Sequence, residues 1–258
     1  MKLRHFILKV VPTVTTTNGD ANINYLTSAN VSFSAHNLQL LRLLHLANPL
    51  LPVGGYSYSE GLESLILQGA IIDRSTLQAW IEGELQAGAI RIETAVMDRA
   101  YQAGLELNTD RLQYWNHWLS AARESEELRH QSWQMGGSLT KLVVELTPEI
   151  QDLISAIVFP CHYAIAFGVT AQHWQIDRHA TILAYLHSWT TNQVGVGVKL
   201  IPLGQTAGQQ IVWQLQDELA DLARAIPTLA DGDLYACSWG SSLSCMQHET
   251  LYSRLFRS

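Results

Sequence analysis

The sequence predicts an all-α protein, a single-domain helical bundle of roughly ten helices, and three observations support this fold class. Apolar residues recur at helical spacing, signals for helix starts are spread along the chain, and no segment alternates apolar and polar residues between hairpin turns. The clearest helix is expected over residues 205–226. Its apolar residues recur every three or four positions and therefore lie on one face: Val212, Leu215, Leu219, Leu222 and Ile226.

Residues 1–35 are expected to form a loose N-terminal extension outside the bundle. They are rich in Thr, Ser and Asn, and Asp20 is the only charged residue after Lys9 in this stretch. Such a composition is typical of loops. Residues 36–258 show no internal repeat and no linker, so this part is expected to be one all-helical domain.

A stiff turn is expected at residues 48–55, which read Asn-Pro-Leu-Leu-Pro-Val-Gly-Gly. Two prolines fix φ there, and two glycines permit conformations that other residues avoid. The turn places Tyr56 at its mouth, either as a plug of the core or as an exposed contact. Ser57 and Glu60 then have the spacing of a capping box, which predicts a helix that includes Leu62.

Further helix starts are predicted along the chain. Ser75 and Gln78 have the spacing of a second capping box. Thr147 stands before a proline, as a cap with a first-turn proline does, and Asp177 is a third expected cap.

A charged pair is expected on a helix surface in the middle of the chain. Arg123 and Glu127 lie four residues apart, which on one helix makes an exposed ion pair worth a few tenths of a kcal/mol, about 0.2–0.5.

The chain is poor in charge, because 16 basic and 23 acidic residues make up 15% of it, against about 25% in a typical soluble domain. The net charge of −7 argues against nucleic-acid binding, which needs a basic surface. The deficit is concentrated in residues 153–216, where only Asp177, Arg178 and Lys199 are charged. Two interpretations stay open: a central helix surrounded by other helices, or a face covered by a second copy or a partner.

No membrane span is expected, because Pro160 and His162 interrupt the uncharged stretch 154–171 and no basic cluster flanks it. The three Cys residues do not make a disulfide framework and fit a reducing compartment, so we expect a cytoplasmic protein.

No catalytic residue, cofactor site or metal site is predicted. The glycine-rich stretches at 195–199 and 204–208 lack the Gly-Lys-Ser/Thr of a phosphate-binding loop. Cys237, Cys245 and His248 have ligand-like spacing, but a closed metal site needs a fourth ligand.

Residues 246–258 form a C-terminal tail that is unusually apolar, with Leu251, Tyr252, Leu255 and Phe256 beside two arginines. The end of a chain is normally polar and frayed. The tail is therefore expected to dock, either on its own core or on a partner.

Taken together, these segments resemble the family of urease accessory proteins called UreF. The matching motifs follow the same order over residues 38–258: Pro49 to Ser59 with Gly61-Leu62-Glu63, Ala122-Arg123-Glu124 with Glu127-Leu128-Arg129, Met135-Gly136, Ser138-Leu139, Pro202 to Thr206 with Gly208-Gln209, and His248 to Phe256. Each motif is short, and their order and spacing together make the resemblance specific.

The resemblance implies an all-helical cytosolic protein with no chemistry of its own, and therefore not an enzyme. UreF-like proteins bind the accessory protein UreD, also called UreH, and form a dimer of such pairs. That platform recruits the GTPase UreG and the urease apoprotein for GTP-dependent nickel insertion.

The resemblance also implies which residues bind partners: Tyr56, Gln205, Tyr252, Arg254, Leu255 and Phe256. The tail would dock into UreD/UreH. Tyr56 and Arg254 would lie near one another at the surface that receives UreG, where the Gly-Gly turn meets the tail, and Gln205 would help to order that region. The charge-poor helices would form the self-association face.

One alternative function stays open, a GTPase-activating protein that acts on UreG through an arginine finger, for which Arg254 is the candidate. On the platform interpretation, removal of residues 248–258 is expected to abolish partner capture and to leave the fold intact.

Overall fold

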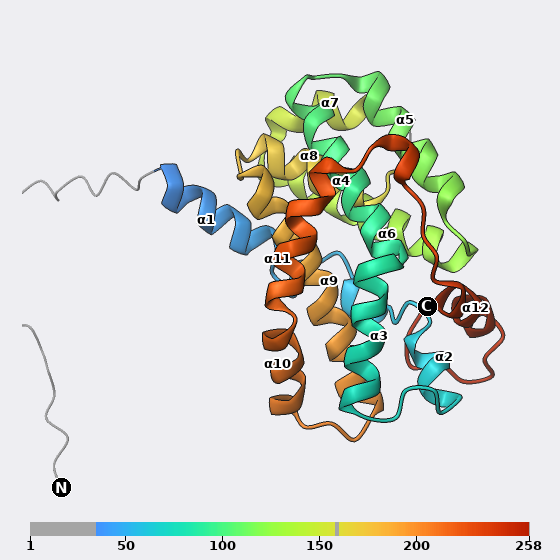
Figure 1. Ribbon diagram of the computed structural model, residues 1–258. Helices are drawn as coiled ribbons and strands as arrows, with labels where there is room; N and C mark the ends of the chain where they lie inside the picture. The colour runs from blue at the N-terminus through green and yellow to red at the C-terminus, as the bar shows by residue number, and fades with distance from the viewer. Residues whose placement is uncertain (1–34, 158–159, 258) are drawn as a thin grey trace, which may run out of the picture. The chain divides into compact units, whose positions relative to one another are not determined.

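The computed structural model describes residues 35–157 and 160–257, and Figure 1 shows their arrangement. Within these residues it contains only helices and connecting segments, which confirms the all-α prediction. The α-helices are α1 (Ala35–Leu46), α2 (Leu62–Leu67), α3 (Arg74–Ala87), α4 (Ala89–Leu105), α5 (Thr109–Ala122), α6 (Glu126–Leu146), α7 (Gln151–Ser155), α8 (Tyr163–His173), α9 (Arg178–Leu200), α10 (Gln205–Gln214), α11 (Gln216–Ala225) and α12 (Trp239–His248). Short 3₁₀ turns are η1 (Gly55–Ser57), η2 (Pro148–Ile150), η3 (Ile226–Thr228) and η4 (Asp231–Asp233).

The N-terminal extension predicted for residues 1–35 lies outside the described residues, apart from Ala35, which begins α1.

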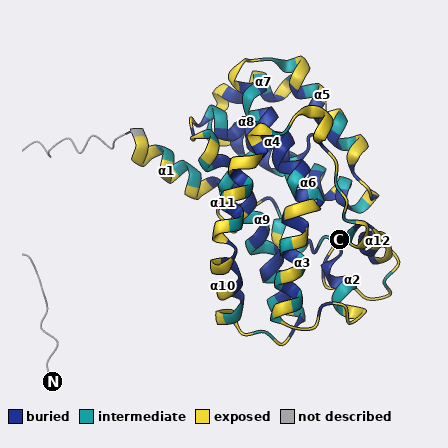
Figure 2. Ribbon diagram, in the orientation of Figure 1, coloured by how far each residue is buried: buried dark blue, intermediate teal, exposed yellow. Residues whose placement is uncertain are grey.

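Helix α8 is the centre of the domain. Every residue from Ala164 to Ala171 is buried, and Figure 2 shows this helix in the dark blue of buried residues. Helix α4 packs along it most extensively, and α1, α5, α6 and α9 also contact it. The two helices α4 and α8 cross closely at Gly168, where a Cβ atom would collide with the backbone carbonyl of Met97. A helix that is apolar on all sides requires such a complete cover.

This burial explains why the region is poor in charge. Residues 164–171 of α8 are covered within the domain, so a self-association face on the charge-poor helices would have to be formed by other residues. In α9, 10 of the 23 residues are buried, and Gly197 packs against the side chain of Leu77 in α3. Among the described residues, no helix is both long enough and apolar enough to cross a membrane.

The helix predicted over residues 205–226 is divided into α10 and α11. They meet at Leu215, whose φ of −84° and ψ of −2° depart from helical values. The predicted apolar face is still buried: Val212, Leu215, Leu219 and Ile226 belong to the core, and Leu222 packs against it. Both helices contact α9, so the side-chain spacing is kept across the change in backbone conformation at Leu215.

Two predicted helix starts agree with the structure at least in position. The Asp177 carboxylate caps α9, because it accepts a hydrogen bond of 2.8 Å from the Ala180 N–H. Pro148 opens the 3₁₀ turn η2, as the motif predicts. The hydroxyl of Thr147, however, does not cap this turn and donates to the Val143 carbonyl at 3.0 Å.

The two predicted capping boxes are wrong. In α3 the cap is Asp73 rather than Ser75: its extended backbone lets its carboxylate accept from the Thr76 N–H at 2.9 Å, and the Thr76 hydroxyl accepts from the Asp73 N–H in return. Ser57 lies in η1, where its hydroxyl donates to the Gly54 carbonyl at 2.7 Å and caps no helix.

Arg123 does not lie on an exposed helix face. It ends α5, is 8% exposed and forms an ion pair with Glu93 of α4. Glu127 belongs to the next helix, α6, and binds other partners. The predicted pair therefore does not form, because the spacing argument assumed one continuous helix.

Two adjacent glycines in α6 allow a matched test of this packing. A Cβ at Gly136 would collide with the backbone of Cys161 and Tyr163, whereas one at Gly137 would meet nothing within 4 Å. We expect Gly136→Ala to lower the free energy of unfolding by about 1–3 kcal/mol, because the backbone of the α8 start must shift. Gly137→Ala should raise it by up to about 1 kcal/mol through helix propensity. Urea unfolding measures both, and equal effects would contradict the packing.

Candidate partner-binding site

Residues 48–61 form the turn that the prolines and glycines predict. Gly54 and Gly61 have left-handed φ values of 78° and 82°, which glycine adopts without strain. Tyr58 is buried and its hydroxyl donates to Gln134 Oε1 at 2.6 Å. Tyr56 is 65% exposed, so of the two roles left open for it the structure favours the exposed contact.

Helix α12 packs against the end of this turn. A Cβ at Gly61 would approach the Ser244 hydroxyl oxygen to 2.6 Å and the Cys245 nitrogen to 2.9 Å. Figure 1 shows α12 beside α2, and both α2 and α6 contact it. The glycine is therefore required twice, by its backbone conformation and by this close approach.

The tail returns from α12 to the same turn and docks on its own domain. The backbone N–H of Arg257 donates to the Ser57 carbonyl at 2.8 Å. Phe256 is 5% exposed, and the Lys199 ammonium lies 5.1 Å from the centre of its ring. Of the two destinations that the sequence allowed for the tail, its own core is the one observed.

Glu63, in the first turn of α2, holds the tail by its backbone. Its carboxylate accepts from the Leu255 N–H at 2.7 Å and from the Phe256 N–H at 3.1 Å, and His248 Nε2 lies 3.0 Å away. Burial opposes ionisation of Glu63. The contacts with Leu255, His248 and Phe256 outweigh burial, so the pKa of Glu63 lies below its usual value. Hydrogen bonds to such a carboxylate are among the strong ones in proteins.

His248 connects this anchor to α6. The imidazole is fully buried, and its Nδ1 lies 3.1 Å from Glu127 Oε2. The other oxygen of Glu127 accepts from an Arg254 guanidinium nitrogen at 2.7 Å. Arg254 is thus positioned by α6, while its side chain remains 38% exposed.

The outward side of α12 and the tail is apolar and exposed. Trp239, Leu243 and Met246 follow helical spacing along α12 and are 74%, 56% and 45% exposed. Tyr252 and Leu255 in the tail have exposures of 105% and 66%. These five residues are called the α12–tail surface below. Exposed Trp and Tyr side chains are typical anchors of protein interfaces.

The structure brings the predicted partner-binding residues of the tail onto one segment but gives them different roles. Tyr252 and Leu255 point to solvent, whereas Phe256 is buried in its own domain. The turn and the tail meet, as expected, but Arg254 binds Glu127 and forms no described contact with Tyr56.

Gln205 lies apart from the tail residues, in the exposed first turn of α10. Among the described residues it forms no hydrogen bond to the tail. Gln209, one turn further along α10, lines the cavity that Tyr56 also lines.

Sequence reasoning missed Glu63 and Glu127, which hold the tail. Both stand within the motifs of the resemblance, yet no spacing rule connects them to residues near position 250. The spacing of His248 suggested only a metal ligand. An acidic residue between the leucines of an apolar helix, as in Leu62-Glu63-Ser64-Leu65, is the one local signal of a buried acceptor.

The predicted effect of deleting residues 248–258 does not fit these contacts. The deletion would remove buried His248 and Phe256 and leave the Glu63 carboxylate buried without its donors. An unpaired buried charge is strongly destabilising. Substitutions of exposed side chains are therefore the better probes of the tail.

The candidate metal ligands do not form a cluster. Within residues 35–157 and 160–257, no group of three or more His, Cys, Asp and Glu is placed to hold a metal ion. Cys237 is exposed and Cys245 is buried. His162 is buried between Ser120 and Ser132, and burial lowers its pKa to about 3, so the ring is neutral.

Glu63→Gln is expected to loosen the tail. The glutamine amide keeps one acceptor oxygen, but its NH₂ group replaces the second oxygen and faces a backbone N–H group of the tail, so one hydrogen bond is lost. The amide hydrogens of Leu255 and Phe256 should exchange at least about tenfold faster, the effect of losing about 1–3 kcal/mol. Hydrogen exchange with mass spectrometry measures this, with the exposed Glu249→Gln as a control that changes nothing. In the unsubstituted protein the folded state lowers the pKa of Glu63. The stability that the anchor contributes is therefore fully present above the ordinary pKa of a glutamate and is lost as the pH falls through the lowered pKa of Glu63. Unchanged exchange in Glu63→Gln would contradict the anchor.

Comparison with known proteins places this chain in a family. The model of the UreF family matches residues 71–216, which is more than half of the chain. The urease accessory protein UreF of Nostoc sp. (strain PCC 7120) is 58% identical over 218 residues, covering 84% of this chain and 95% of the relative. That of Synechocystis sp. (strain PCC 6803) is 51% identical over 229 residues, covering 84% and 97%. UreF of Hahella chejuensis is 35% identical over 222 residues, covering 86% and 99%. The chain therefore belongs to the UreF family of urease accessory proteins.

Proposed function

We propose that this protein is a non-catalytic platform for urease maturation. It binds the accessory protein UreD/UreH and recruits the GTPase UreG and the urease apoprotein, so that nickel is inserted in a GTP-dependent step. In the complex it acts as a homodimer. Its membership of the UreF family supports a role in urease maturation, and the platform role goes beyond that.

One observation carries the proposal: the tail is anchored by its backbone while its apolar side chains face solvent. Glu63 holds the N–H groups of Leu255 and Phe256, and Tyr252 and Leu255 remain exposed. An anchored segment loses little further conformational entropy when a partner covers it, which favours binding. The α12–tail surface is therefore the proposed docking site for UreD/UreH.

The proposed surface for UreG is the neighbouring turn. Tyr56 is exposed there, and the Ser57 carbonyl is joined to the Arg257 N–H of the tail. Tyrosine and arginine side chains are both enriched among interface residues that contribute most of the binding energy. The partner that occupies the tail thus lies close to the residues proposed to receive the GTPase.

The double substitution Tyr252→Ala with Leu255→Ala tests the docking site. It removes two exposed side chains and keeps the backbone groups that Glu63 binds, so the thermal midpoint should be unchanged. Affinity for UreD/UreH should fall at least about thirtyfold, because two central interface residues are lost. Isothermal titration calorimetry with purified UreD/UreH measures this.

A matched control is Leu105→Ala with Tyr114→Ala, which removes a leucine and a tyrosine that are also exposed, from another part of the domain. This control should bind as the unsubstituted protein does. Undiminished binding of the Tyr252/Leu255 double variant would overturn the proposed docking site.

The alternative function, activation of UreG by an arginine finger, has one observation in its favour. The Arg254 side chain is 38% exposed and lies next to the proposed partner surface. Its guanidinium is, however, bound to Glu127, which itself contacts the buried His248. A finger would have to leave this carboxylate to reach a phosphate.

GTP turnover by UreG distinguishes the two functions. An arginine finger accelerates hydrolysis by about 10³-fold to 10⁵-fold, whereas a platform should change the rate by less than about tenfold. The measurement compares UreG alone with UreG in the assembled complex, using the unsubstituted protein and Arg254→Lys. A large acceleration that disappears in Arg254→Lys would favour the finger over the platform.

A further inference from the structure

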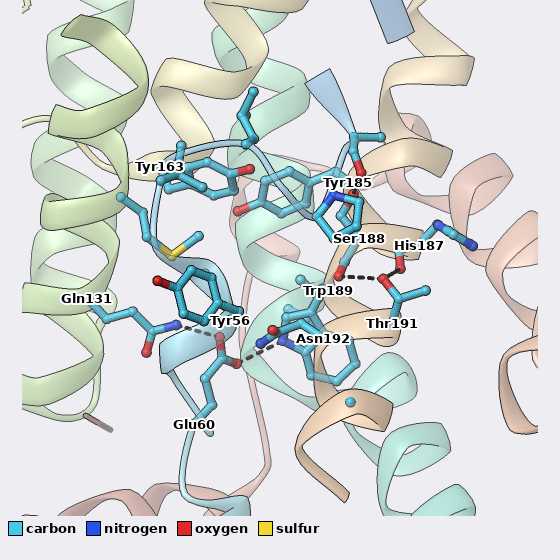
Figure 3. Close-up of a pocket in the computed structure, with 18 of the residues that line it drawn as sticks. Tyr56, Glu60, Gln131, Tyr163, Tyr185, His187, Ser188, Trp189, Thr191 and Asn192 are labelled. Atoms are coloured by element: carbon cyan, nitrogen blue, oxygen red, sulfur yellow. Dashed lines mark hydrogen bonds between the residues drawn. The ribbon is translucent and has the colours of Figure 1, made fainter. Parts of the chain in front are cut away.

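A cavity of about 460 Å³ lies beneath Tyr56, and Figure 3 shows the residues around it. Its walls come from the turn at residues 48–61 and from α1, α4, α6, α8, α9 and α10. Asn48, Pro49 and Lys199 also line it, and Pro49 is exposed, so the cavity opens to solvent near the turn. Cavities of about 300–1,000 Å³ are the size at which proteins bind small molecules or inserted side chains.

Glu60 projects into this cavity from a strained position. Its φ of 52° is in the left-handed region, which residues other than glycine rarely adopt. Gln131 Nε2 donates to one carboxylate oxygen at 2.8 Å, and Trp189 Nε1 donates to the other at 2.8 Å, as the dashed lines in Figure 3 show. Backbone strain of this kind costs about 1–3 kcal/mol and is concentrated at functional sites.

No cation is bonded to Glu60 in the described part of the chain. Both of its hydrogen-bond donors are neutral, and the nearby Arg123 forms its ion pair with Glu93. Tyr185 also donates to Glu93, at 3.1 Å. Burial and the Glu93 carboxylate raise the pKa of Glu60 to about 7, and they outweigh the opposing effects of the Trp189 hydrogen bond, the Arg123 charge and the Gln131 hydrogen bond. The cavity is thus lined by two carboxylates, the buried Arg123 guanidinium that pairs with Glu93, and the exposed Lys199, whose ammonium lies against the Phe256 ring. Glu60 is the carboxylate without an ion-pair partner among the described residues, and a buried charge requires one.

Aromatic rings form much of the wall above this carboxylate. Tyr163 and Tyr185 are stacked with their ring centroids 5.8 Å apart, and Trp189 and Tyr56 line other sides. Figure 3 shows these rings around the space that Glu60 faces. Aromatic faces attract cations, and rings combined with a carboxylate are the means by which proteins recognise organic cations.

We propose that this cavity binds an organic cation, the end of a lysine or arginine side chain that a partner protein inserts beside Tyr56. The aliphatic part of such a side chain matches the apolar walls, and its charged end pairs with Glu60. An isolated metal ion fits less well, because no group of three or more ligating side chains is described there. This proposal goes beyond the platform function, because the observations that support it concern the cavity and not the tail.

Cation binding should strengthen as the pH rises from about 6 to about 8, because the proton on Glu60 must leave. The other titratable and charged groups that face Glu60 or line the cavity are Tyr56, Glu93, Arg123, Tyr163, Tyr185, Cys245, His187 and Lys199. Burial raises the pKa of Tyr163, Tyr185 and Cys245, so they keep their protons in this range. Burial also lowers the pKa of His187, which favours the neutral ring.

The test uses the full chain and n-butylguanidinium as the probe, with the neutral n-butylurea as its counterpart of the same shape. Isothermal titration calorimetry should show saturable binding of one n-butylguanidinium per chain, with at least about tenfold weaker binding of n-butylurea. The affinity of the cation should rise between about pH 6 and about pH 8. Absence of saturable binding, or equal binding of the two probes, would overturn the proposal.

Two variants locate the site. Glu60→Gln removes the charge and keeps the shape, so the affinity for n-butylguanidinium should fall at least about tenfold and lose its pH dependence. Glu84→Gln is the matched control, because Glu84 is also a buried carboxylate with a raised pKa but does not line the cavity. Its affinity should be unchanged.

Gly195→Leu keeps the test decisive if Glu60→Gln does not fold. Gly195 lines the cavity on α9, and a Cβ atom added there would meet nothing within 4 Å, so a larger side chain is tolerated and fills the space. Binding of n-butylguanidinium should be lost while every charge is kept. Unchanged binding in both variants would show that the cation binds elsewhere and would refute the site.

Discussion

Residues 164–171 of α8 are buried on every side and carry no charge, so the surrounding helices are placed by the need to cover them. Two close approaches make the cover tight, α4 at Gly168 and α6 at Gly136, and in both a single added methyl group would meet backbone. Interiors packed in this way deform little. Because α2, α9 and α12 are attached to this core, the turn at residues 48–61 and the tail have a fixed base.

Two carboxylates three residues apart show how this base is used. In a continuous helix Glu60 and Glu63 would lie on the same face. The left-handed conformations of Glu60 and Gly61 break that relation and send the two side chains to different places. Glu63 meets N–H donors of the tail and has a lowered pKa, while Glu60 enters the cavity beside Glu93 and has a raised one. One short turn thus produces an ionised anchor and a carboxyl group that titrates near neutral pH.

Much of the fold followed from the sequence, because helical spacing reports which side chains face the core. The buried face of Leu215, Leu219 and Ile226 is an example, although the spacing did not reveal that the helix is divided into two at Leu215. Local capping rules failed at Ser57 and Ser75. Near Ser75 the side chain of Asp73 caps the helix instead, and after Ser57 the helix begins only beyond Gly61, which has a left-handed conformation.

The site was less accessible to sequence reasoning, because its contacts join residues far apart in the chain. The docking of the tail could be expected from its apolar composition, and the partners of its residues could not. Glu63 and Leu255 are separated by most of the domain, and only the path of α12 brings them together. Buried carboxylates such as Glu60 look like ordinary helix caps until the chain folds around them.

The Glu63 anchor has a consequence for how such a surface can change over evolutionary time. It binds the tail through peptide N–H groups, which every residue except proline provides. The exposed side chains at positions 252 and 255 can therefore change without weakening the hydrogen bonds that attach the tail to Glu63. With the docking role proposed for the tail, a lineage can alter what the tail binds, one residue at a time, without first losing the contacts that hold the segment in place.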